Sequence, residues 1–237
     1  IRDRSLMGWK LAPALAAGNT IIMKPSEVTS ISLLHWAEVV RDIMPPGVLN
    51  VITGYGTEAG EEIVKHPLIP IITFTGSVKT GKRIAMYAAE NLKKVSLELG
   101  GKDPVIICDD ADIDVAAKGT SWGGFVNSGQ VCTSIERVYV YNNVADRFTE
   151  ALVEEAEKVQ LGDPMDKNTD VGPMASKAQL KNTVEKVELA KKEGARLLTG
   201  GGRPTEFSRG YFFSPTVFDR VTADMEIVTE ESFSPVI

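Results

Sequence analysis

The sequence predicts an α/β protein, with a Rossmann-like parallel sheet in its first hundred residues and a second α/β domain behind it. Two observations support this fold class. Short β-rich runs alternate with segments of helical periodicity up to about residue 90. In addition, 43% of the 237 residues are hydrophobic, which is enough for a sizeable core. Such alternation is typical of right-handed crossovers that place helices on both faces of a parallel sheet.

The first half of the chain contains three strand–helix units. We expect strands at Thr20–Met23, which we interpret as buried, at Val48–Ile52 and at Ile69–Phe74. Helices are expected over about 31–41, which Pro45-Pro46-Gly47 stops, over about 57–65 and over about 78–89. Ligands of such sheets bind at the carboxyl ends of the strands, where Lys24, Gly54 and Gly76 fall.

The pattern changes after the strand Val95–Leu97, and we place a domain boundary near Leu99-Gly100-Gly101, giving domains 1–99 and 100–237. Asp112 is placed to cap a helix that runs to about Val126. The other expected elements are a strand at 137–141, a helix at 144–159, a helix opened by a capping box at 176–179 and ended by Gly194, and a loop at 200–204.

Composition excludes several classes of protein. A net charge of −6 and a pI near 5.1 argue against a nucleic-acid-binding surface. No run approaches the ~18 apolar residues of a membrane span. Two cysteines form no disulfide framework, and Cys108, after Val105-Ile106-Ile107, is expected to be buried. We therefore expect a reducing, cytoplasmic setting. Because the chain begins at Ile1 without an initiator methionine, we also expect a fragment or a shortened relative of a longer protein.

One thiol and one carboxylate are the candidates for chemistry. Cys132 and Glu98 lie 34 positions apart, each among small residues after an apolar run, which suggests covalent catalysis with a separate acid/base. Cys132 could equally be an inert thiol and Glu98 an exposed edge carboxylate. A cysteine hydrolase would need a histidine, but His35 and His66 have no sequence context that favours this role.

Three glycine-rich or polar segments are candidates for nucleotide binding. Residues 76–82 match GxxxxGK, but Arg83 stands where a metal-binding Ser or Thr would be needed, so we expect no metal site. Ser77 at a helix N-terminus can still bind phosphate. The segment 54–60 is one residue too long for GxGxxG. Lys24 can reach a ribose, and Glu27 favours NAD over NADP because a carboxylate repels a 2′-phosphate. Plain turns and a solvated loop are the alternatives.

Taken together, these segments resemble the NAD(P)-dependent aldehyde dehydrogenase superfamily over essentially the whole chain. Several motifs occur in the family's order and at fitting intervals. They are Trp9–Asn19, Lys24–Glu27, Phe74–Ser77, the segments around Glu98 and Cys132, and Glu230–Val236, which is similar to the family's EExFGPV.

The resemblance implies oxidation of an aldehyde to a carboxylic acid, with NAD as the cofactor and NADP as the alternative. Cys132 would form a thiohemiacetal and then a thioester, and Glu98 would activate the water that hydrolyses it. Glu98 also favours hydrolysis over acyl transfer to coenzyme A. The residues implied to bind the cofactor are Lys24, Ser26, Glu27, Gly54, Gly76, Ser77, Leu99, Glu231 and Phe233.

Two positions depart from the family pattern. An asparagine that helps to form the family's oxyanion hole has no counterpart in Ile1–Ser5, and losing one such donor costs roughly 10²–10³ in turnover. Ser234 replaces a family glycine and would be strained at a positive φ. The alternative function is therefore a catalytically impaired fragment that binds a nucleotide or a partner. The resemblance implies a small aldehyde as the substrate and a homo-oligomer for the full-length protein, while the charge and the lack of a long apolar run argue against a nucleic-acid or membrane partner.

Overall fold

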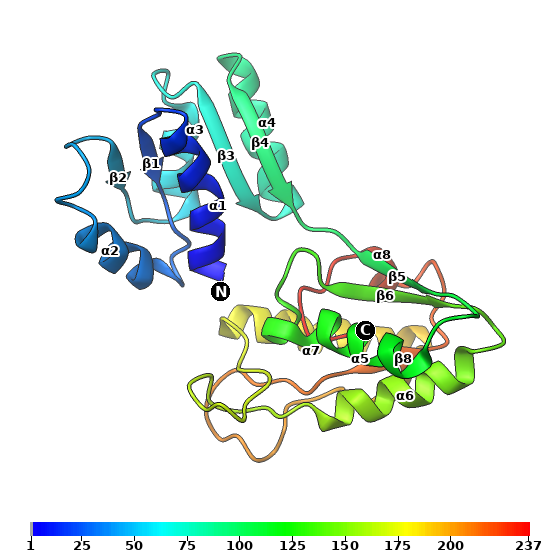
Figure 1. Cartoon of the computed structure of the whole chain (residues 1–237). Coiled ribbons are helices and arrows are strands. Elements are labelled where there is room, and N and C mark those ends of the chain that lie inside the picture. The colour runs from blue at the N-terminus through cyan, green and yellow to red at the C-terminus, as the bar shows by residue number, and fades with distance from the viewer. Residues whose placement is uncertain (1) are drawn as a thin grey trace. The chain divides into compact units, whose positions relative to one another are not determined.

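The computed structural model describes residues 2–237, with side chains from Ser5 onward. The chain divides into two compact units, Ile1–Gly100 and Gly101–Ile237 (Figure 1). Part of the Ile1–Ser5 segment, where the oxyanion asparagine of the family would be sought, lies outside the described residues.

The first unit is built from strand–helix–strand connections. Its elements are α1 (Arg2–Ala16), β1 (Ile21–Met23), α2 (Ser30–Val39), β2 (Leu49–Val51), a π-helical turn (Gly56–Gly60), α3 (Glu61–Lys65), β3 (Ile71–Gly76), α4 (Val78–Glu90) and β4 (Lys94–Leu99). β1 pairs with β2 and β3 pairs with β4, both in parallel, as the sequence predicts. Among the described residues, hydrogen bonds join these strands as two separate pairs rather than as one continuous sheet. Within each pair, a crossover helix connects the two strands.

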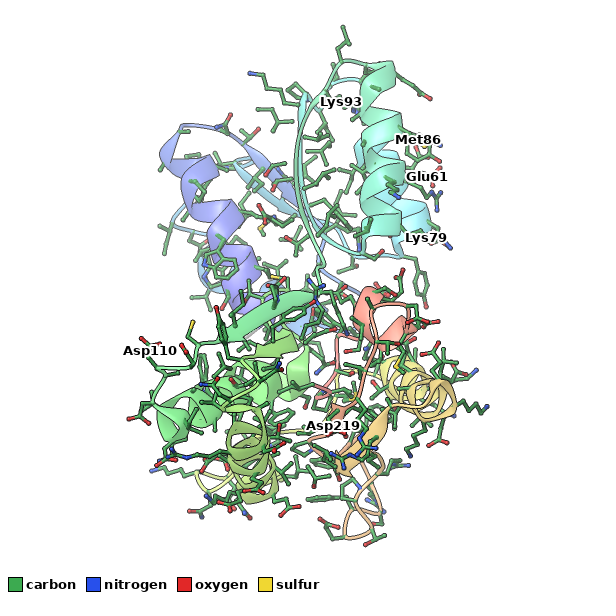
Figure 2. The ribbon with its side chains drawn as sticks, turned by 90° about the vertical axis from the view of Figure 1, so that its right-hand side faces the viewer. Glu61, Lys79, Met86, Lys93, Asp110 and Asp219 are labelled. Carbon is green, nitrogen blue, oxygen red and sulfur yellow. The ribbon has the colours of Figure 1, made fainter. Side chains whose placement is uncertain are left out.

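The side chains of α4 show why this helix packs on its strand pair. Gly81, Ile84 and Ala88 recur at helical spacing and form its buried face. Ile84 meets Ile72 of β3 in the core of the unit. On the other side, Glu61 of α3 accepts hydrogen bonds from Arg83 (2.8 Å) and Tyr87 (3.1 Å). Figure 2 labels Glu61 beside α4.

The second unit combines a parallel and an antiparallel strand pair with three long helices. Its elements are β5 (Asp103–Ile107), α5 (Ile113–Phe125), a 3₁₀ turn (Val126–Gly129), β6 (Ile135–Val140), α6 (Ala145–Lys158), α7 (Lys177–Glu193), β7 (Arg196–Thr199), β8 (Val217–Asp219) and α8 (Glu226–Thr229). β5 and β6 are parallel, and β7 and β8 are antiparallel.

Two apolar clusters form the core of the second unit. In α6, Phe148, Leu152 and Ala156 recur every four residues and face Ala117 of α5. Figure 1 shows α5 and α6 running next to each other, as their contacts require. The second cluster gathers α7 and α8 with β8. Gly194 ends α7 in a left-handed conformation (φ 102°), as predicted from the sequence.

Several local predictions are wrong or only half right. Cys108 is exposed, because Ile107 points into the core and the next side chain of an extended chain points away. The strand β1 is only half-buried, with Ile22 40% exposed. The capping box is incomplete: Ser176 accepts the Gln179 N–H, but the Gln179 amide turns to the backbone of Ser232 instead.

The helix α1 was not predicted from the sequence. Its strongest stop signal, Pro13, lies inside the helix, and its apolar residues follow no clear helical stripe. Leu11 is nevertheless buried. Among the described residues, no helix is long and apolar enough to cross a membrane.

The N-cap of α5 gives a test of the second unit. One oxygen of Asp112 accepts the N–H groups of Asp114 (3.1 Å) and Val115 (3.2 Å). We expect Asp112→Ala to lower the free energy of unfolding by about 1 kcal/mol, since two helix N–H groups lose their acceptor. Asp110→Ala, at the exposed site labelled in Figure 2, is the control and should change it by less than about 0.5 kcal/mol. Denaturant unfolding measures both, and equal effects would contradict the capping role.

Candidate functional site

Cys132 lies in a turn between α5 and β6 and is partly exposed. Two residues later, the buried hydroxyl of Ser134 donates to the carbonyls of Gly123 (3.2 Å) and Gly124 (3.1 Å) at the end of α5. A side chain at Gly123 would collide with Ile135 of β6, and one at Gly124 would collide with Ile237. The glycines therefore let α5 and β6 approach closely enough to fix both ends of the cysteine turn.

The residues just before Cys132 adopt an uncommon backbone. Asn127, Ser128 and Gly129 are all left-handed, with φ of 56°, 58° and 65°. Non-glycine residues reach this region at a cost, and such strain persists only where the surroundings hold it. A Cβ on Gly129 would lie 2.0 Å from the carbonyl oxygen of Ser234. Glycine is therefore required here by both conformation and space.

Side-chain hydrogen bonds hold this left-handed turn. Asn127 Nδ2 donates to the Gln130 carbonyl and Gln130 Nε2 donates to the Asn127 carbonyl, each at 3.0 Å. Gln130 Oε1 accepts the N–H of Ala175 (2.9 Å), and the Ser128 hydroxyl donates to the Gly172 carbonyl (2.6 Å). Ser128 and Gln130 are buried, so the conformation in front of Cys132 is fixed by the second unit as a whole.

Glu98 lies within β4, opposite Thr75 of β3, rather than after a strand end. Its side chain is exposed. Lys10 of α1 approaches the same face of the strand pair and donates to the Thr73 hydroxyl at 3.0 Å. Burial lowers the pKa of Lys10, and attraction to Glu98 opposes this shift. The candidate carboxylate thus has an ammonium as its neighbour.

Lys24 occupies the carboxyl ends of β1 and β2, where the sequence places it. Its ammonium donates to the carbonyls of Pro25 (2.7 Å) and Gly54 (3.1 Å). Its chain lies over Gly60, whose added Cβ would be 3.5 Å from the lysine Cε. Gly54 has φ of 146° and passes close to Ala59, so it forms a tight turn into the following helix. Ser26 and Glu27 lie exposed beside Lys24.

Ser77 caps α4 at the end of β3, which is where a helix N-terminus can receive a phosphate. Its hydroxyl accepts the Thr80 N–H at 3.3 Å, while the first N–H groups of the helix have no acceptor within it. Lys79, labelled at this end of α4 in Figure 2, adds a positive charge. Leu99 packs against Gly81, whose added Cβ would be 2.6 Å from Leu99 Cδ2.

In the second unit, Glu231 and Phe233 belong to a segment held by a buried carboxylate. Glu136 of β6 accepts the N–H groups of Ser232 and Phe233, each at 2.8 Å. Its partner is Lys102, at 2.5 Å. Burial lowers the pKa of Lys102, and Glu136 opposes that shift. Burial also raises the pKa of Glu231, and the negative charge of the nearby Glu136 raises it further. The Gly101 N–H, which donates to the Glu231 carboxylate, opposes this shift.

The strain expected at Ser234 is not present there. The left-handed residue of this segment is Phe233, with φ of 50°, because its neighbours hold both of its peptide groups. The hydroxyls of Ser232 and Ser234 are buried and have no hydrogen-bond partner among the described residues. Serine instead of the family's glycine at position 234 therefore costs the desolvation of a buried hydroxyl and causes no backbone strain.

Sequence reasoning missed Lys10, Lys102 and Glu136. Lys10 stands in the Trp9–Asn19 motif, which was the only signal available for it. Glu136 lies 96 positions before its bonded Ser232, so no local pattern could connect them. The two histidines remain without a catalytic setting: His35 and His66 are exposed, and His66 Nδ1 accepts the N–H of Leu68 in its own turn (3.3 Å).

Comparison with known proteins defines the class to which these features belong. Residues 4–237 match the model of the aldehyde dehydrogenase family. The chain is a member of this family, and the α/β fold predicted from its sequence is confirmed by solved structures.

The particular relatives include enzymes named for amino- and betaine aldehydes. The chain is 45% identical over 230 residues to aminoaldehyde dehydrogenase 1, peroxisomal, from Malus domestica, covering 97% of the chain and 46% of the relative. It is 47% identical to betaine aldehyde dehydrogenase from Brucella anthropi, covering 98% and 48%. An NAD⁺ complex of aldehyde dehydrogenase from Bacillus cereus superposes with a TM-score of 0.95 at 45% identity, covering 98% of this chain and 47% of that one. The chain thus spans about half the length of these relatives.

The left-handed turn before Cys132 can be tested with glycine substitutions. We expect Gly129→Ala to lower the free energy of unfolding by about 2 kcal/mol or more, because the new Cβ meets the Ser234 carbonyl and φ is positive. Gly119→Ala in α5 is the matched control: its Cβ meets nothing within 4 Å, and it should stabilise the helix by about 0.5–1 kcal/mol. Denaturant unfolding separates the two, and a neutral Gly129→Ala would contradict the close approach.

The raised pKa of Glu231 predicts a pH-dependent effect of Glu231→Gln. A carboxyl whose pKa is raised by folding destabilises the folded state most where it is ionised in both states, so its penalty is absent below the ordinary pKa and grows as pH rises from there through the folded pKa. We expect Glu231→Gln to raise the melting temperature at neutral pH, and this gain to vanish as pH falls below about 4, the ordinary pKa of Glu. Thermal melts across this range measure it; a gain that grows on acidification would contradict the shift.

Proposed function

We propose that the protein carrying this chain is an NAD-dependent aldehyde dehydrogenase that forms a carboxylic acid through a thioester on Cys132. The observation that supports this best is the cysteine turn. A partly exposed thiol follows three left-handed residues that side-chain hydrogen bonds hold in place, and Gly129 of that turn touches the segment of Glu231 and Phe233. A buried structural thiol would need no such support.

Cys132 is the proposed nucleophile. Its thiolate attacks the aldehyde carbon, the carbon–sulfur bond forms, and the carbonyl electrons move to oxygen to give a thiohemiacetal anion. The Cys132 backbone N–H is the proposed donor to this oxygen. Bound NAD would supply the acceptor for the two electrons and the hydrogen that leave the carbon, and the residue left on Cys132 would be a thioester.

Glu98 is the proposed general base. It takes a proton from water, the water oxygen attacks the thioester carbon, and the carbon–sulfur bond breaks to release the acid and the Cys132 thiolate. Its exposure gives it access to water, and the nearby Lys10 offers a compensating charge. Hydrolysis in this way needs no coenzyme A.

The donor groups of the first unit fit a dinucleotide. We infer that Lys24 and Glu27 hold the adenosine ribose, with Ser26 and Gly54 shaping the turns around them. The N-terminal N–H groups of α4, beside Gly76 and Ser77, would receive the pyrophosphate. Leu99 would line the same cofactor site. The carboxylate of Glu27 is the reason for preferring NAD to NADP.

In the second unit, Glu231 is proposed to bind the nicotinamide ribose and Phe233 to pack beside the nicotinamide. The first aldehydes to assay are those in the relatives' names, aminoaldehydes and betaine aldehyde. We further propose a homo-oligomer in the cytoplasm; the two free thiols support a reducing compartment, although some relatives are named as peroxisomal or chloroplastic.

The proposed chemistry is tested by variants of the natural polypeptide that carries this chain. We expect Cys132→Ser to lower aldehyde-dependent NADH formation by several orders of magnitude, because the nucleophile is lost. Cys108→Ser is the matched control and should keep full activity, since this exposed thiol has no proposed role. The Glu98→Gln variant should form one NADH per Cys132 in a first rapid phase. It should then turn over slowly, because the thioester is no longer hydrolysed efficiently. Full activity of Cys132→Ser would end the proposal.

A further inference from the structure

The buried carboxylate of Glu136 accepts three hydrogen bonds from groups of the second unit. Its side chain is 3% exposed and that of Lys102 is 7% exposed. One oxygen receives Lys102 Nζ (2.5 Å) and the Ser232 N–H (2.8 Å), and the other receives the Phe233 N–H (2.8 Å). A buried charge of this kind is retained only where its partners are in place, so Glu136 is committed to this arrangement.

The peptide groups of Ser232 and Phe233 are held from both sides. While Glu136 accepts their N–H groups, Gln179 Nε2 donates to both of their carbonyls, at 3.1 Å and 2.9 Å. The main chain cannot rotate here without breaking several bonds, two of them to a charged group, which are the stronger kind. This clamp also accounts for the left-handed φ of Phe233.

The clamp holds the main chain from which the side chains of Glu231 and Phe233 project. Glu231 precedes the clamped residues, and its carboxylate accepts the N–H of Gly101, next to Lys102. Phe233 is itself clamped. Arg137 Nε adds a bond to the Lys102 carbonyl at 2.7 Å, which ties the lysine's backbone to β6. The main chain that carries both side chains thus depends on the Glu136–Lys102 pair together with Gln179.

We propose that Glu136 is a positioning residue for the cofactor: by clamping Ser232 and Phe233 it presents Glu231 and Phe233 to the nicotinamide riboside of NAD. This inference rests on the proposed function, because it takes the cofactor-binding role of Glu231 from there. Glu136 itself contacts no cofactor. Lys102 balances the negative charge of Glu136 across the 2.5 Å ion pair.

The competing explanation is that the pair only stabilises the fold. The test uses Glu136→Gln, Lys102→Met and the double variant, which carries no unpaired buried charge. The amide that Glu136→Gln introduces has only one oxygen for two N–H groups, so the clamp is lost in the double variant even where stability returns. Asp219→Asn is the matched control: the same chemical change breaks the Arg196–Asp219 pair on β8, at the residue labelled in Figure 2.

NAD binding to the natural polypeptide is followed by quenching of protein fluorescence, and exchange of the Ser232 and Phe233 amides by hydrogen–deuterium exchange. We expect Glu136→Gln and the double variant to raise the Kd for NAD on the order of tenfold and to speed exchange at both amides. KM for NAD should rise with the Kd, and KM for the aldehyde should stay constant. Asp219→Asn should leave the Kd unchanged.

Two results would overturn the inference. In the first, the double variant recovers both its melting temperature and its affinity for NAD, which a purely stabilising pair predicts. In the second, exchange at the two amides is unchanged in Glu136→Gln. Glu231→Gln separates this failure from failure of the proposed function. If Glu231→Gln weakens NAD binding and Glu136→Gln does not, only the positioning role is lost; if wild-type protein binds no NAD, both are lost.

Discussion

The buried Glu136 carboxylate joins three parts of the second unit that are distant in sequence. It bonds to Lys102 just after the break between the units and to Ser232 and Phe233 near the end of the chain, 96 and 97 positions away. An unpaired charge at this depth would cost several kcal/mol. The segment from Glu231 to Ser234 therefore takes its position from an electrostatic requirement rather than from regular secondary structure.

The cysteine turn depends on that segment in turn. Gly129 lies against the Ser234 backbone, so the left-handed path from Asn127 to Gly129 fits only while residues 232–234 stay in place. Gln130 and Ser128 attach the turn to the loop before α7. The partly exposed thiol and the candidate cofactor residues of this unit are thus parts of one packed arrangement, which explains why small residues surround Cys132.

Local signals in the sequence were sufficient for most elements. Asp112, Ser77, Ser176 and Gly194 act at helix ends through groups a few residues away, and α6 shows its buried face in its own spacing. No helix was predicted for α1, because Pro13 lies inside it and its apolar residues follow no clear helical stripe. The prediction was wrong for Cys108, whose exposure follows from the side to which Ile107 turns. The Gln179 side chain does not complete the predicted capping box and instead donates to the carbonyls of Ser232 and Phe233. These residues are distant in the sequence, so no local pattern could predict the contact.

By itself the sequence determined the α/β class, the parallel direction of the first strands and the family, and it supplied the residues proposed for chemistry, because each depends on short-range pattern or on motifs in order. Only the tertiary structure decided that Phe233 rather than Ser234 is left-handed, that Lys10 neighbours Glu98, and that Glu136 holds the final segment. The physical reason is range: capping and periodicity act within a few residues, whereas buried charges and close backbone contacts select partners through space.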